Sequence, residues 1–149
     1  MSMLSYQEKT IWASLLVLIG ASAYFFITVF DGYLSGEPLT IAQIAPPLLS
    51  MILLILAAEV ALHVTLSLSG QEEAKDERDV LVAAKAARNA YYLLITGLAM
   101  LGGHAAMAEV FAFGRMPGVE VAVLAVVLAV TIAEVGHYAS QLYYYRRGV

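Results

Sequence analysis

Four long apolar runs alternate with short polar stretches along the chain. The runs cover about residues 11–30, 46–68, 90–113 and 119–143, and each approaches the roughly 20 residues that a helix needs to cross a bilayer. The first run continues past an Ala-Ser-Ala sequence at 21–23 to spanning length, so we interpret it as an uncleaved helix rather than a signal peptide. The pattern predicts an all-α fold, in which residues 1–149 form a single domain, an integral membrane four-transmembrane-helix bundle.

The polar stretch at residues 71–89 predicts a further helical segment. Its acidic residues come first and its basic residues last, which matches the helix dipole. No glycine or proline separates it from the third apolar run, so we expect one long helix that extends beyond the membrane. Pro46 and Pro47 suit the first turn of the second spanning helix, where a missing N–H has little cost.

The basic residues predict the orientation of the bundle. Seven of the eight lie on one side of the four apolar runs. They are Lys9, Lys75, Arg78, Lys85, Arg88, Arg146 and Arg147, and the exception is Arg115. Because basic residues concentrate in cytoplasmic segments, we expect both termini and the extension of helix three to be cytoplasmic.

Composition supports a membrane protein and excludes several other classes. The chain is 61% hydrophobic and 13% charged, whereas soluble domains average about 45–50% and about 25%. It contains no cysteine, which excludes disulfides, thiolate metal sites and cysteine nucleophiles. It has no basic patch suited to direct nucleic-acid binding. We find no nucleophile–base pattern, phosphate loop or dinucleotide fingerprint, and we therefore do not expect an enzyme.

Small residues recur along the third and fourth apolar runs at helical spacing. Lipid provides no hydrophobic drive between helices, so close approach through small side chains matters. We expect the two helices to pack as a tight antiparallel pair. The residues assigned to this contact are Gly102, Gly103, Ala125, Ala129, Ala133 and Gly136.

Ionisable residues within apolar runs are the main candidates for chemistry, because they are costly in a membrane. Glu59 and His63 share one face of the second run, and Glu134 and His137 share one face of the fourth. Four interpretations remain open. The residues could bind a divalent metal, the histidines could ligate haem b, or the carboxylates could carry protons or a cationic substrate. Alternatively, each carboxylate could hydrogen-bond a neighbour and hold helices together.

Three short motifs resemble those of a family of small, uncharacterised bacterial four-helix membrane proteins. They are Tyr6-Gln7-Glu8-Lys9, Asp76-Glu77-Arg78-Asp79 and Tyr145-Arg146-Arg147-Gly148. The resemblance implies the topology and a place in the bacterial inner membrane. Some such proteins resemble membrane partners of small regulators. The chain departs from the family pattern at Val149, where the family usually has an aromatic residue.

All three motifs fall on the side of the predicted cytoplasmic termini, which suggests a protein-binding surface there. Our first hypothesis is an accessory subunit or a membrane anchor for a cytoplasmic protein, with a homo-oligomer as another possible assembly. The proposed contact residues are Asp76, Glu77, Arg78, Asp79, Arg146 and Arg147. This hypothesis requires no cofactor. The alternatives are a haem- or metal-binding redox protein using His63 and His137, and a proton-coupled transporter using Glu59 and Glu134.

Overall fold

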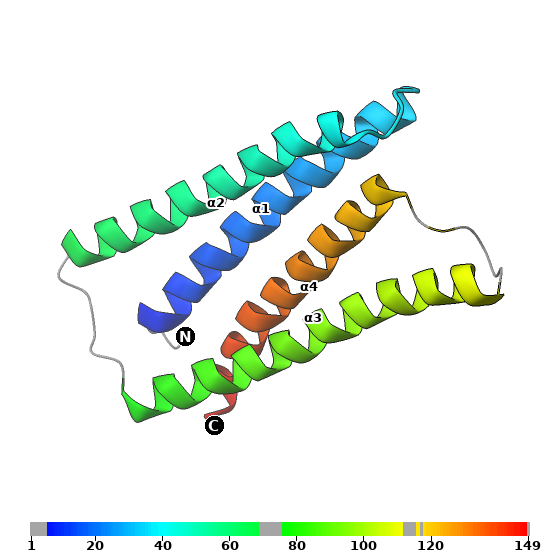
Figure 1. Cartoon of the computed structure of the whole chain (residues 1–149). Coiled ribbons are helices and arrows are strands. Elements are labelled where there is room, and N and C mark those ends of the chain that lie inside the picture. The colour runs from blue at the N-terminus through cyan, green and yellow to red at the C-terminus, as the bar shows by residue number, and fades with distance from the viewer. Residues whose placement is uncertain (1–5, 69–75, 112–115, 117, 149) are drawn as a thin grey trace.

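The computed structural model describes residues 6–68, 76–111, 116 and 118–148. These residues form four α-helices: α1 (Tyr6–Leu34), α2 (Ile41–Leu68), α3 (Glu77–Phe111) and α4 (Val119–Arg147) (Figure 1). Each helix is long and apolar enough to cross a membrane. The prediction of an all-α chain with four helices of spanning type is therefore confirmed.

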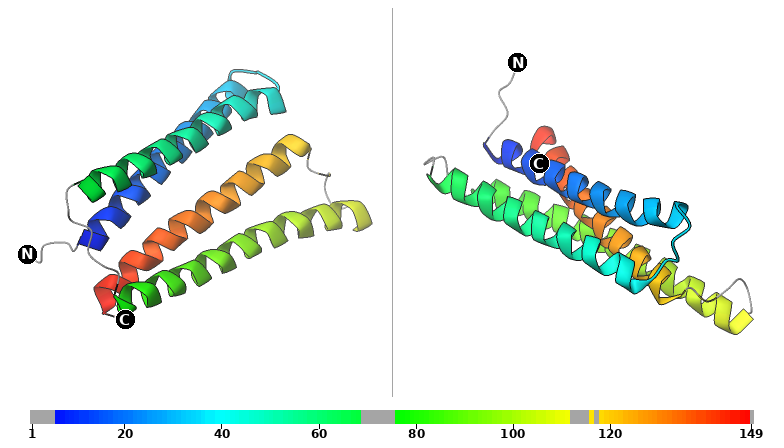
Figure 2. Two further views of the ribbon diagram at one scale, coloured as in Figure 1. Left: turned by 60° about the vertical axis from the view of Figure 1, so that its left-hand side comes forward. Right: turned by 90° about the horizontal axis from the view of Figure 1, so that it is seen from above.

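The helices form two antiparallel pairs that meet through α1 and α4. Helix α2 packs on α1, and α3 packs on α4. Helix α4 lies between α1 and α3 (Figures 1 and 2) and is the only helix that contacts all three others within the described chain. The start of α1 and the end of α4 lie at the same end of the bundle as the end of α2 and the start of α3 (Figure 1). We call this the terminal end of the bundle, and the opposite end the far end.

Helix α2 begins earlier than the sequence predicted. It starts at Ile41, so Pro46 and Pro47 lie inside the helix rather than in its first turn. The start is determined by Thr40, whose backbone N–H and hydroxyl both donate to the side-chain oxygen of Gln43, at 3.3 and 3.2 Å. This is one half of a capping box: the Gln43 side chain accepts the Thr40 backbone N–H, while the Gln43 backbone N–H donates to the Thr40 carbonyl at 3.1 Å. The prolines then cost two intrahelical bonds near that start.

Helix α3 is continuous from its polar start to its apolar end, as expected from the absence of helix breakers. The predicted helical residues 71–75 lie outside the described residues, and α3 begins at Glu77. Helix α4 extends to Arg147, beyond the predicted limit at 143. The polar start of α3 therefore does not stand alone, because the last turn of α4 lies against it.

The interior of the bundle is centred on α1. Its buried residues form two clusters. The cluster shared with α2 consists of Ala21, Phe25, Val29, Ile44 and Met51. The cluster shared with α4 consists of Ile11, Leu15 and Leu142. Most side chains of α2 and α3 are exposed although the helices are apolar. An apolar surface of this extent needs a membrane or another protein to cover it.

Candidate functional site

Small residues line the face of α4 that packs against α3. Ala129 and Ala133 are buried on it. A Cβ added to Gly97 would lie 2.8 Å from the Cβ of Ala129, and one added to Gly136 would meet Leu93. These positions show how closely the two backbones approach.

Two of the glycines expected at this contact are not part of it. A Cβ on Gly102 or Gly103 would have nothing within 4 Å. Ala125 instead lines a groove on the side of α1. The reason is geometric, because α3 and α4 diverge toward the far end (Figures 1 and 2). The close approach is therefore at Gly97, a residue of the same small-residue pattern.

The start of α3 is a second capping box. Asp76 precedes the helix, and its carboxylate accepts the backbone N–H of Asp79 at 2.7 Å. The Asp79 carboxylate in turn accepts the backbone N–H of Asp76 at 3.2 Å. Two acids of the Asp76–Asp79 motif therefore cap the start of α3, where the helix dipole favours negative charge.

The Asp76–Asp79 motif and the C-terminal motif are in direct contact. The Tyr145 hydroxyl donates to Asp79 Oδ1 at 2.6 Å. Arg78 Nη2 donates to the Tyr145 carbonyl at 2.8 Å, and its guanidinium lies 5.8 Å from the ring centroid. That carbonyl belongs to the last turn of α4, where intrahelical donors are lacking. Gly148 ends the helix in the left-handed conformation, at φ 72°.

Further polar contacts follow along the same α3–α4 seam. The Asn89 amide donates to Ser140 Oγ and to the Tyr144 hydroxyl, both at 3.1 Å. Lys85 lies 5.7 Å from the ring centroid of Tyr144. Of the other residues proposed to bind a partner, Arg147 lies over the Tyr143 ring, at 4.9 Å, while Glu77 and Arg146 are exposed. The proposed surface thus combines side chains that contact other parts of the bundle with exposed side chains, Glu77 and Arg146, for which the described residues show no such contact.

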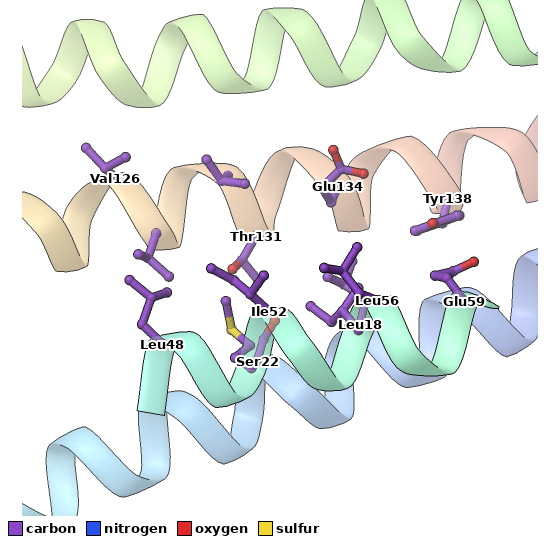
Figure 3. A pocket seen from close by; sticks show the side chains of 14 residues that line it. Leu18, Ser22, Leu48, Ile52, Leu56, Glu59, Val126, Thr131, Glu134 and Tyr138 are labelled. Atoms are coloured by element: carbon purple, nitrogen blue, oxygen red, sulfur yellow. The ribbon is translucent and has the colours of Figure 1, made fainter. Parts of the chain in front are cut away.

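A cavity of about 450 Å³ lies on the other side of α4, between α1, α2 and α4 (Figure 3). Its walls are mainly aliphatic, from Leu48 and Val126 at one end to Leu18 and Leu56 further along. Its polar lining residues are Ser22, Glu59, Thr131, Glu134 and Tyr138. We call this cavity the apolar pocket.

The acidic groups of the apolar pocket gather toward one end of it. Glu59 of α2 and Tyr138 of α4 lie together at that end in Figure 3, with Glu134 one turn of α4 away. Tyr138 has a side-chain hydrogen bond with Ser14 of α1. Neither carboxylate has a hydrogen bond or ion pair with any residue that the structure describes. The buried Ser22 hydroxyl also has no partner among the described residues.

A second cavity, of about 440 Å³, lies at the terminal end. Residues of all four helices line it, and nine of the twelve carry a polar side-chain group, so it offers more polar groups than the apolar pocket although carbon atoms still make up much of its wall. The polar lining residues are Gln7, Thr10, Ser14, Glu59, His63, Asp79, Tyr138, Gln141 and Tyr145. We call this cavity the vestibule. Glu59 and Tyr138 line both cavities, so the two are adjacent at these side chains.

The two histidines do not share a cavity. His63 lines the vestibule, whereas His137 lines neither cavity and its Nε2 lies 2.7 Å from the Gln141 amide nitrogen on its own helix. Among the described residues, which include Glu59, His63, Glu134 and His137, no three histidines or acids are grouped so that they could hold a metal ion. The four candidate ligands are therefore distributed over different parts of the site.

Three residues of the site, Tyr138, Tyr145 and Asn89, were not predicted from the sequence pattern. Tyr138 follows Glu134 by four residues, and this spacing places both on one helix face. The Thr-x-x-Gln and Asp-x-x-Asp spacings also resemble capping boxes in the sequence itself. By contrast, the contacts of Tyr145 and Asn89 join helices, and no local pattern indicates them.

No protein-family model matches the chain, and neither a curated protein nor a solved structure matches it. Function must therefore be inferred from the geometry of the site.

Proposed function

We propose that the chain is a multi-pass membrane protein that binds a lipophilic organic cation in the apolar pocket and exchanges it for a proton. The observation that carries this proposal is the presence of two carboxylates, Glu59 and Glu134, without a described protein partner beside an aliphatic cavity. This is the transport interpretation of the sequence, with Tyr138 added to the site.

The lining of the pocket favours a cation with a large apolar body. A volume of about 450 Å³ lies within the roughly 300–1,000 Å³ of small-molecule sites. Leu18, Leu48 and Leu56 offer contact with hydrocarbon, while Glu59 and Glu134 offer negative charge. An organic cation suits this lining better than a metal ion, because no three histidines or acids among the described residues are grouped to ligate one.

Exchange follows from the cost of charge in an apolar environment. An ionised carboxylate without a partner is strongly disfavoured there, so it must bind either a proton or a cation. Binding of the cation to Glu59 or Glu134 therefore releases a proton, and departure of the cation takes one up. The distribution of basic residues supports a cytoplasmic terminal end, which is the orientation we adopt for an inner-membrane protein.

The test is binding of tetraphenylphosphonium to the purified protein in detergent, measured by equilibrium dialysis. We expect Glu59→Gln and Glu134→Gln each to weaken binding by about tenfold or more, equivalent to about 1.4 kcal/mol. Glu109→Gln is the matched control, because Glu109 is an exposed acid of α3 outside the pocket. Binding of the wild-type protein should weaken as the pH falls. Unchanged affinity in the Glu59→Gln/Glu134→Gln double variant would rule out the proposal.

A second candidate function is the docking of a cytoplasmic protein, as first suggested by the motifs. Its supporting observation is an exposed stripe near the start of α3. Glu77, Leu81, Ala84 and Arg88 are all exposed and recur at helical spacing. Leu81 is 49% exposed although it precedes the predicted spanning segment.

Affinity capture from cell membranes in mild detergent tests this second function. We expect Leu81→Glu to abolish recovery of a stoichiometric protein partner that the wild-type chain and Leu81→Met both retain. Equal recovery with all three chains, or recovery of further copies of this chain alone, would contradict docking on this stripe.

A further inference from the structure

We infer that Glu59 is the proton-exchange group and that the vestibule is its aqueous route to the solution at the terminal end. This inference rests on the proposed function and adds the path and the direction of the proton. It also assigns different roles to the two carboxylates, because Glu59 lines both cavities, whereas Glu134 lines the apolar pocket but not the vestibule.

The inferred aqueous route requires that water can occupy the vestibule. Polar side chains reach it from every helix: Ser14 from α1, His63 from α2, Asp79 from α3 and Gln141 from α4. A buried water typically needs 2–4 polar partners and occupies about 30 Å³ in the liquid. A cavity of about 440 Å³ with this lining therefore has both the room and the hydrogen-bonding groups for a chain of waters.

One residue of each of the two motifs at the terminal end lines the vestibule. Asp79 and Tyr145 both line it and hydrogen-bond each other at 2.6 Å. Arg78, the residue before Asp79 on α3, donates to the Tyr145 carbonyl in the last turn of α4. These contacts tie the start of α3 to the end of α4 at the terminal end of the bundle.

The path ends at Glu59 and Tyr138. The titratable groups that line either cavity with Glu59 come from three helices: His63 from its own helix, Asp79 from α3, and Glu134, Tyr138 and Tyr145 from α4. Helix α1 contributes only uncharged side chains to the same cavities. Tyr138 lies with Glu59 at one end of the apolar pocket (Figure 3).

The exchange step balances in charge and atoms. When the cation leaves the apolar pocket, one proton moves from a vestibule water to a Glu59 carboxylate oxygen, and the solution at the terminal end replaces it. When a cation binds, the Glu59 O–H bond breaks and the proton returns by the same waters. The net charge of the pocket is the same before and after each exchange.

The absence of cysteine from the natural chain allows a direct test of water access. Single variants Ser14→Cys, Ala83→Cys and Ala57→Cys are treated with a positively charged, membrane-impermeant thiol reagent in membrane vesicles of either orientation. Ser14 lies within the vestibule and Ala83 on its α3 wall. Ala57 is exposed two residues from Glu59, on the opposite face of a helix with about 3.6 residues per turn.

We expect Ser14→Cys and Ala83→Cys to react roughly tenfold or more faster than Ala57→Cys, because the reactive thiolate requires water. The reaction should occur only when the reagent is on the terminal-end side. Equal rates for Ser14→Cys and Ala57→Cys would overturn the aqueous route. If tetraphenylphosphonium binding persisted in that case, the proposed function would stand and only the aqueous route would be refuted. Rapid reaction of Ser14→Cys in a protein that does not bind tetraphenylphosphonium would instead refute the proposed function.

A second measurement distinguishes the two carboxylates. A hydrophobic carbodiimide modifies protonated carboxyl groups, and mass spectrometry locates the product. Glu59 should be modified more as the pH on the terminal-end side falls, and its modification should be indifferent to the pH on the far side. Modification of Glu59 that follows the far-side pH would overturn the inference, as would modification of Glu134 with the same terminal-end dependence.

Discussion

The two faces of α4 carry polar residues in opposite states. On the face toward α3, the Asn89 amide donates to Ser140 and Tyr144. On the face toward α2, Glu134 has no described partner and lies beside a cavity. Both faces belong to one helix and share its aliphatic composition.

The difference separates residues that stabilise the bundle from residues that are available for a ligand. A buried polar group is inexpensive when it is bonded and costly when it is not. The α3 face satisfies its polar groups within the chain, so substitutions there should reduce stability. On the α2 face, the Glu134 carboxylate is left for a proton or a ligand, so its substitution should change binding and leave stability almost intact.

The largest effect on stability is expected from Gly97→Val on the α3 face. A Cβ at this position would lie 2.8 Å from the Cβ of Ala129, so the two backbones must separate. Overpacking of this kind costs about 1–3 kcal/mol. The matched control is Gly102→Val, where a Cβ would meet nothing within 4 Å. Thermal unfolding in detergent, followed by circular dichroism, measures both, and equal melting temperatures would contradict the close approach at Gly97.

A loss of stability of similar or smaller size is expected from Asp79→Ala. This change removes the acceptor for the Tyr145 hydroxyl and for the backbone N–H of Asp76. Each hydrogen bond contributes about 0.5–1.5 kcal/mol, so we expect a lower unfolding temperature and faster exchange of amide hydrogens at the start of α3. Glu77→Ala is the control, since Glu77 is exposed on the same turn. If the two variants unfolded alike, the contact between the motifs would not stabilise the bundle.

The smallest effect on stability is expected from Glu134→Gln on the α2 face. The side chain is exposed and bonds no residue within the described chain, so its neutralisation should change the free energy of unfolding by less than about 0.5 kcal/mol. The same variant should lose tetraphenylphosphonium binding. A fall in melting temperature as large as that of Asp79→Ala would remove the distinction between the two faces of α4.

The order and type of the helices could be predicted from the sequence because each apolar run is of spanning length. Helix α2 starts before the predicted Pro46, because the contacts between Thr40 and Gln43 begin the helix at Ile41 and the helix tolerates both prolines near its start. The acids at 59 and 134 were identified from polarity alone, since charge is rare in such runs. Which glycines meet α4 could not be predicted, because small residues cover most of α3 and only the crossing of the helices selects Gly97.

Local chemistry thus determined the four helices, their caps and the presence of ionisable groups inside apolar runs. Only the tertiary structure decided which of those groups are satisfied. It joined Asp79 to Tyr145, which are far apart in the sequence, and it left Glu59 at the junction of an apolar and a polar cavity. The physical reason is that helix formation depends on neighbours within one turn, whereas the satisfaction of a polar side chain depends on what another helix brings to it.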